Sequence, residues 1–119
     1  MGVFEEKFNR EPETKSTSCL SALGYLMQTG DTDLHSFVLV NTDSATNYVK
    51  FYNVSAVANV GTDTPVMRVG VAAGTSLVFE PPYPVKFSKG LNVAATSAPG
   101  DDITASVGAG EVFGFFQYN

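Results

Sequence analysis

The sequence predicts an all-β protein, an antiparallel β-sandwich of Greek-key or jelly-roll type with seven to eight short strands. Short runs rich in β-branched and aromatic residues recur along the chain, and each is followed by glycine, proline, asparagine or aspartate. Intervals with helical periodicity do not separate these runs, which is typical of sandwiches and small barrels. With 119 residues, we expect one sandwich domain at 18–119 and an extended N-terminal arm at 1–17.

The composition argues against several classes of function. The net charge is −5, and the basic residues after the arm are isolated, whereas phosphate binding needs clustered lysine and arginine. We therefore expect no direct contact with nucleic acid. No apolar run approaches the roughly 18 residues that cross a bilayer, and the first residues lack a signal-peptide pattern, so we expect cytoplasmic synthesis and no membrane partner. The single cysteine, Cys19, excludes an internal disulfide and is best explained as a small buried residue.

The predicted arm differs from the rest of the chain in its density of charge, and Pro12 argues against a long helix. We expect an extended or partly disordered segment. Phe4 and Phe8 lie four residues apart and would share one face of a helical turn. The functional alternative is an arm that docks its apolar residues onto a neighbouring subunit. Its partner-contact candidates are Val3, Phe4 and Phe8.

Residues 34–54 are expected to form a β-hairpin with a polar connector at 41–47. Leu34–Asn41 is apolar on both faces, which predicts a central strand. Tyr48–Val54 alternates more cleanly, with Val49 and Phe51 toward the core. Its other face is expected to be solvated or to contact a partner, because tyrosine is enriched in interfaces. The contact candidates on this face are Tyr48, Lys50 and Tyr52.

The remaining elements follow from the same pattern. We expect a strand with a bulge at 18–27, a second hairpin from Val66 to Phe79, short strands at 85–87 and 91–96, and a central or covered strand at 111–118. The prolines between Pro81 and Pro84 forbid sheet pairing and predict a corner where the chain crosses between sheets. The loop at 97–110 is long enough to be functional or mobile.

The sequence offers no set of residues for catalysis, a metal or a cofactor. His35 is the only histidine and is expected to be a hydrogen-bonded strand residue. Asp63 and the Asp101–Asp102 pair lack the alternating ligand spacing of a calcium loop, so they are expected to cap local turns. We therefore predict that the protein is not an enzyme and binds no cofactor.

Five segments carry a resemblance to small phage and prophage virion proteins: Leu39–Thr42, Tyr48–Asn53, Val60–Val66, Phe87–Leu91 and, more weakly, Val107–Val112. The resemblance implies a virion structural protein, most similar to a capsid decoration (cement) protein of bacteriophages. Such a protein would sit on the capsid surface, bind the major capsid protein, form a homo-oligomer (a trimer is favoured) and have no catalytic residues. Deletion of the arm is then expected to weaken capsid binding.

Two other functions stay open at this point. One is a tail, neck or fibre component of the same virion. The other is a carbohydrate-binding β-sandwich, for which Tyr48 and Tyr83 are candidates for an aromatic platform, although the chain has no tryptophan.

Overall fold

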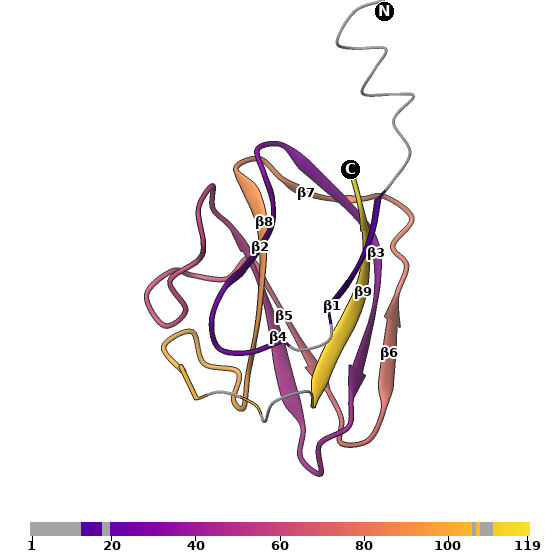
Figure 1. The fold of residues 1–119 in the computed structure, drawn as a ribbon, viewed down its shortest axis with the longest axis vertical. Coiled ribbons are helices and arrows are strands. Elements are labelled where there is room, and N and C mark those ends of the chain that lie inside the picture. Colours follow the sequence, from indigo (N-terminus) through magenta and orange to yellow (C-terminus); the bar gives the residue numbers. More distant parts are fainter. Residues whose placement is uncertain (1–12, 18–19, 106, 108–110) are drawn as a thin grey trace, which may run out of the picture.

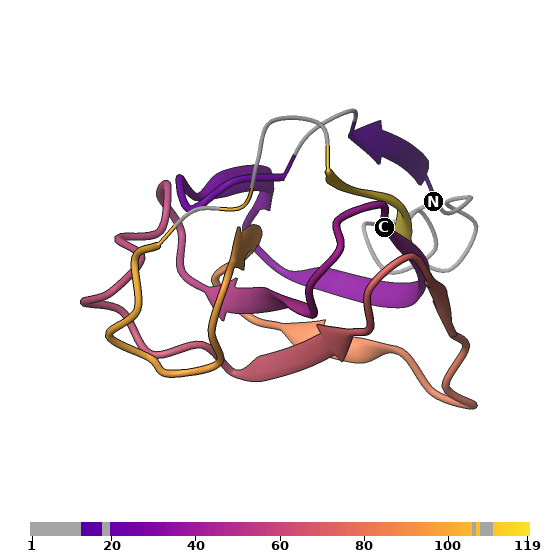
Figure 2. The same cartoon turned by 90° about the horizontal axis from the view of Figure 1, so that it is seen from below.

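The computed structural model describes the backbone of residues 13–17 and all atoms of residues 20–105, 107 and 111–119. These residues form a β-sandwich of two antiparallel sheets (Figure 1, Figure 2). The strands are β1 (Glu13–Thr17), β2 (Tyr25–Thr29), β3 (Thr32–Asn41), β4 (Asn47–Asn53), β5 (Met67–Val71), β6 (Ser76–Phe79), β7 (Val85–Phe87), β8 (Gly90–Thr96) and β9 (Val112–Tyr118).

The strand order is that of a jelly roll. Sheet A has the order β1-β9-β3-β6, with β7 also paired to β3, and sheet B has the order β2-β8-β4-β5. Since β6 pairs with Phe37–Val40 and β7 with Thr32–Leu34, they lie end to end along one edge of β3 and act as one interrupted strand. The predicted fold class is confirmed, as are the central positions of β3 and β9.

The core lies between the sheets and is centred on Phe37 of β3. Its ring centroid lies 5.0 Å from that of Phe51 in the opposite sheet, 4.8 Å from that of Phe79, and 6.1 Å from that of Phe116. Phe37 is 1% exposed. Gly114 lies beneath this cluster on β9, because a Cβ there would approach the Phe116 ring to 2.8 Å. The aromatic side chains of both sheets therefore meet in one continuous core.

The two predicted hairpins were wrong. β3 belongs to sheet A and β4 to sheet B, and the same change of sheet separates β5 from β6. The polar connector after β3 bridges the two sheets around the buried side chain of Asn41. Asn41 Nδ2 donates to the carbonyl oxygens of Ala45 and Val71, both at 2.9 Å, and its Oδ1 accepts from the Asp43 amide at 3.0 Å and from Asn47 Nδ2 at 3.1 Å. Hydrogen bonds that strand pairing would supply in a hairpin are supplied here by one side chain.

The N-terminal boundaries also differ from prediction. Residues 13–17, placed in the arm, form the edge strand β1, with Glu13 opposite Tyr118 and Thr17 opposite Gly114. The domain therefore begins at or before Glu13. β2 begins at Tyr25, which lies opposite Val93 of β8, rather than at Ser18. The preceding Gly24 approaches the backbone of Ala58 so closely that a Cβ would lie 2.7 Å from its carbonyl oxygen. The predicted bulge is present, but between Leu26 and Gln28.

The prediction that the chain crosses between sheets at the proline corner after β6 was wrong, because β7 returns to the same edge of β3. Proline has no amide hydrogen, so Pro81, Pro82 and Pro84 interrupt the pairing along β3 without ending it. The corner leaves Tyr83 80% exposed.

Candidate protein-binding surfaces

The outer face of sheet A carries an apolar patch that we call the sheet A face. Val38 of β3 lies opposite Val78 of β6 on one side and Phe115 of β9 on the other. The next row places Val40 opposite Phe113, and the rings of Phe113 and Phe115 meet edge to face with centroids 6.4 Å apart. The sheet A face therefore consists of Val38, Val40, Val78, Phe113 and Phe115.

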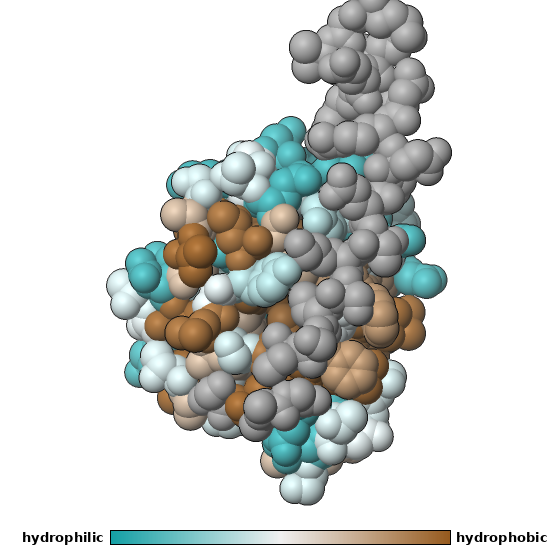
Figure 3. Space-filling model, in the orientation of Figure 1, coloured by the Kyte–Doolittle hydropathy of each residue, from teal (hydrophilic) through white to brown (hydrophobic). Residues whose placement is uncertain are grey.

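This face is unusual because the solvent side of an antiparallel sheet is normally polar. Val78 is 60% exposed and Phe115 is 43% exposed, while the other three residues are half-buried. Figure 3 shows hydrophobic side chains gathered beside β9 and a second group over the segment that precedes β2. A contiguous apolar area on a sheet marks a surface that another chain segment or protein covers.

The outer face of sheet B is covered by two loops of the same chain. Residues 54–66 and 97–105 lie side by side over β4 and β8 (Figure 1, Figure 2). Asn92 of β8 holds the first loop, because its Oδ1 accepts from the Ala58 amide and its Nδ2 donates to the Val54 carbonyl, both at 3.0 Å. Tyr52, Ala58 and Ala94 form a second, small apolar cluster beneath that loop.

This cover overturns the prediction that Tyr48, Lys50 and Tyr52 form an exposed contact face. Lys50 and Tyr52 are both 0% exposed. Tyr48 is half-buried and packs beside Gly70, where a Cβ would lie 3.1 Å from its ring. Alternation correctly placed the three side chains outside the main core, but the two loops shield this face from solvent. Only Tyr48 retains partial exposure.

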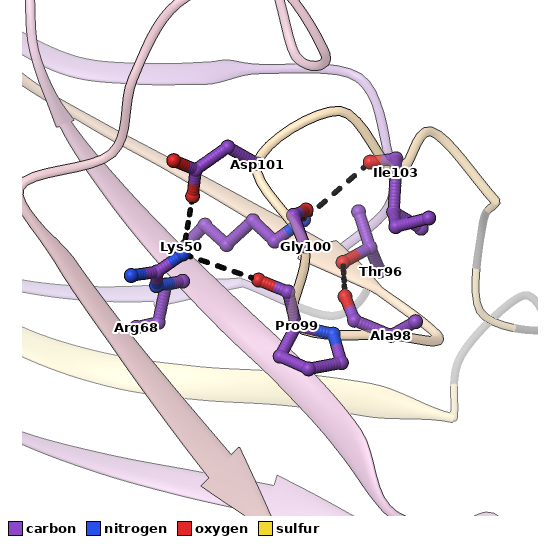
Figure 4. Close-up of polar contacts among 8 residues, drawn as sticks. All are labelled: Lys50, Arg68, Thr96, Ala98, Pro99, Gly100, Asp101 and Ile103. Atoms are coloured by element: carbon purple, nitrogen blue, oxygen red, sulfur yellow. Dashed lines mark hydrogen bonds and ion pairs between the residues drawn. The ribbon is translucent and has the colours of Figure 1, made fainter.

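Lys50 anchors the second loop through its ammonium group (Figure 4). Its Nζ donates to the Gly100 carbonyl at 2.6 Å and more weakly to the Ile103 carbonyl at 3.4 Å. Burial lowers the pKa of Lys50, the Asp101 carboxylate opposes this shift, and Arg68 adds to it. Arg68 also forms an ion pair with Asp101 at the exposed rim of the loop. Lys50 is therefore a structural residue that binds backbone oxygens.

The hydroxyl group of Tyr52 is buried without a hydrogen-bond partner among the described residues. Burial raises the pKa of Tyr52, and the carboxylates of Asp101 and Asp63 raise it further. A phenol with a raised pKa stays neutral at physiological pH, so Tyr52 contributes to the second cluster through the packing of its ring.

Replacing Lys50 with methionine should release the loop at 97–105. A hydrogen bond to a charged group contributes about 1.5–3 kcal/mol, so the opening free energy of the loop should fall by about that amount. The amides of Ser97 and Ile103 report this opening because they donate within the loop, to the carbonyls of Ala105 and Gly100. Their hydrogen exchange should accelerate by about 10–100-fold.

Arg68→Ala is the control for this prediction, because its ion pair with Asp101 has both side chains nearly half exposed. Such a pair contributes less than about 1 kcal/mol. A second readout is pH. Because the pKa of Lys50 is lowered in the folded state, the unfolded state binds more protons as the pH rises toward the ordinary lysine pKa of about 10.5, and wild-type stability should rise there through this group. Lys50→Met should lose this rise. Equal exchange in both variants would contradict the assignment.

A groove lies beside the covered face, between residues 22–24 and residues 57–60. It measures about 660 Å³, and Thr62 and Thr104 complete its lining. Leu23 is 80% exposed and Val57 is 58% exposed at this groove. Asp63 follows on the same loop, and its carboxylate caps the Asn59 amide at 2.8 Å. The groove therefore presents two exposed aliphatic side chains on a backbone that Asp63 and Asn92 hold in place.

The groove could not be predicted directly from the sequence. The outward positions of β8 carry the small or polar residues Asn92, Ala94 and Thr96, all 0% exposed. Small outward residues on a strand are the only pattern that could have indicated a covering loop. The apolar character of Phe113 and Phe115 was visible, and the prediction of a covered β9 rested on it.

The other predicted site residues have different outcomes. Val3, Phe4, Phe8 and Cys19 lie outside the described residues. His35 is confirmed as a hydrogen-bonded strand residue, with its Nε2 2.9 Å from Asn119 Oδ1. Asp63 caps a turn as expected, whereas Asp101 pairs with Arg68. In the part of the chain that the structure describes, no group of three histidine, cysteine or acidic residues is placed to hold a metal, and no helix is long and apolar enough to cross a membrane.

These features define a jelly-roll domain whose prominent surfaces are an apolar sheet face and an apolar groove. No protein-family model matches the chain, and no curated protein matches its sequence. A chain in a solved structure described as "Bacillus endospore appendages form a novel family of disulfide-linked pili" is similar to it, with a TM-score of 0.44 and 17% identity over 92% of this chain and 90% of that one. Similarity at this level carries no inference about function.

Proposed function

We propose that this protein is a structural component of a bacteriophage virion, a decoration (cement) protein that binds the major capsid protein and stabilises the shell. Support comes from the segments that resemble virion proteins and from the jelly-roll topology, an architecture that viral capsid domains and lectins share. Topology alone does not establish function, so the proposal rests on the surfaces.

The observation that carries the proposal is the groove with its exposed Leu23 and Val57. Leu23 is an aliphatic side chain that is 80% exposed on a segment fixed by the close approach of Gly24 to Ala58. A fixed, solvated aliphatic pair is suited to insertion against a partner, because its burial costs little conformational entropy. Many copies on one shell would add these modest contacts into strong overall binding.

The test uses decoration-free capsids of the phage that encodes the protein. Leu23→Asp combined with Val57→Asp should weaken binding by about 10–100-fold, because loss of interface anchors typically costs 1–3 kcal/mol in total when each is modest. Saturation is measured by co-sedimentation. Tyr83→Asp is the matched control, since Tyr83 is also 80% exposed but lies on the proline corner.

Failure of the wild-type protein to bind these capsids would contradict the decoration role. Full binding by the double variant would contradict only the groove as the contact. Electron microscopy of labelled virions tests the tail, neck or fibre alternative, because signal confined to the tail would replace the capsid location.

The carbohydrate-binding alternative receives little support from the structure. Tyr48 belongs to sheet B, whereas Tyr83 lies on the corner beside sheet A, so they share no platform. Of the two candidates, Tyr83 is the one that is largely exposed and available to stack on a sugar. Binding to a glycan array that Tyr83→Asp abolishes would favour this alternative.

A further inference from the structure

We propose that residues 3–8 fold back over the sheet A face of their own chain in the free protein. The segment that binds is the apolar part of the N-terminal segment, with Val3, Phe4 and Phe8. The site that it covers is the sheet A face defined above. This goes beyond the proposed function, because it concerns a contact within one chain and holds whichever partner the groove binds.

The connection to β1 brings the segment to this sheet. Residues 1–12 precede Glu13, which pairs with Tyr118 at the β9 edge of sheet A. In the same ladder Ser16 lies opposite Phe115, three positions further along. At about 3.4 Å per residue, Phe115 is therefore about 10 Å from the level at which the segment enters, and Val38 is one more strand spacing of about 5 Å across the sheet.

The segment is long enough to reach the patch. Phe8 lies five residues before Glu13 and can span at most about 17 Å, while Phe4 can span about 30 Å. Phe4 and Phe8 fall on one side of the chain whether it is extended or helical, because a separation of four residues satisfies both periods. Both rings can therefore face the patch together.

Connectivity decides between the chain's own segment and that of another copy. A segment tethered a few residues from its site has an effective concentration on the order of millimolar. At micromolar protein concentration the segment of the same chain therefore occupies the site first. Covering Val78 and Phe115, which are 60% and 43% exposed, removes apolar surface that would otherwise favour association.

A tryptophan reporter tests this contact in the full chain. The sequence contains no tryptophan, so Phe115→Trp places a single fluorophore on the sheet A face. Phe4→Ser with Phe8→Ser should increase acrylamide quenching of this reporter by about twofold and shift its emission to longer wavelength, because side-chain contacts over it are lost. Glu5→Ser with Glu6→Ser is the matched control and should change neither. Deletion of residues 1–12 should reproduce the phenylalanine variant.

A second reporter and a dilution series make the outcomes distinct. Val66→Trp lies at a 58% exposed position by sheet B and should be insensitive to every variant of the segment. Protection of the Phe115→Trp reporter should be constant from about 1 to 100 μM in a monomer, well below the millimolar effective concentration. Equal quenching with and without Phe4 and Phe8 would overturn the proposal. Protection that develops only as concentration and molar mass rise would also overturn it, in favour of a second copy.

Discussion

Replacing Phe37 with alanine should lower the free energy of unfolding by about 3–5 kcal/mol. Phe37 is 1% exposed, and its ring contacts aromatic rings from β4, β6 and β9. Truncation removes the apolar transfer energy of the ring and leaves a cavity where both sheets meet. Neighbouring side chains cannot fill this cavity by a small shift, because Phe116 and Leu39 are already packed closely against Gly114. Chemical denaturation with an unchanged m-value would measure this loss.

Phe115→Ala provides the control for this prediction in the same sheet. It removes an identical side chain from the outer face, where 43% of the residue is exposed. The loss should be less than about half of that for Phe37→Ala, because no enclosed cavity forms. Equal losses would show that the outer face contributes as much packing as the core and would contradict the assignment of the core.

Replacing Asn41 with aspartate should destabilise the protein by about 3–5 kcal/mol at neutral pH. Asn41 is 1% exposed, and its Nδ2 donates to the Ala45 and Val71 carbonyls. In the variant, the carboxylate oxygen that replaces Nδ2 would face these two acceptors without a donor, while the other oxygen would keep the Asp43 amide and Asn47 Nδ2. Burial would raise the pKa of the new carboxyl group, so the folded state would bind a proton more readily than the unfolded state. The deficit should therefore shrink as the pH falls from 7 toward about 4.

Asn53→Asp is the matched control for Asn41→Asp. Its Oδ1 accepts from the amides of Lys89 and Gly90, and its Nδ2 donates to the Ser88 hydroxyl, which can rotate and donate to a carboxylate instead. This variant should lose less than about 1 kcal/mol. A pH-independent loss in Asn41→Asp would show that a shape change, rather than the buried charge, destabilises the fold.

The sequence predicted strands well because their local pattern reflects their surroundings. Leu34–Asn41 is apolar on both faces, and β3 is central and contacts both the core and the sheet A face. Its partners could not be predicted, because alternation shows which side of a strand is buried but not which strand lies beside it. The hairpin prediction failed for this reason, since Asn41 connects the two sheets through hydrogen bonds to residues as far along the chain as Val71.

The burial of Lys50 could not be predicted from its own strand. The carbonyl that binds its Nζ belongs to Gly100, 50 residues away, in a loop of small and polar residues that resembles an ordinary surface loop. Tyr52 was placed outside the core correctly, but the segment that covers it contributes only Ala58 and two half-buried valines, Val54 and Val60. Weakly apolar covers of this kind leave almost no periodic signal.

The pairing of β9 with both β1 and β3 has a consequence for the order of folding. Sheet A stays in two unjoined parts until β9 has been synthesised, because β9 alone connects the edge strand β1 to the rest. Until then β3 presents an unpaired, apolar edge. Since the closing contacts join distant parts of the chain, this step is slow compared with local pairing, and the unpaired edge can recruit other nascent chains. Pairing of β9 between β1 and β3 therefore determines whether this jelly roll closes or aggregates.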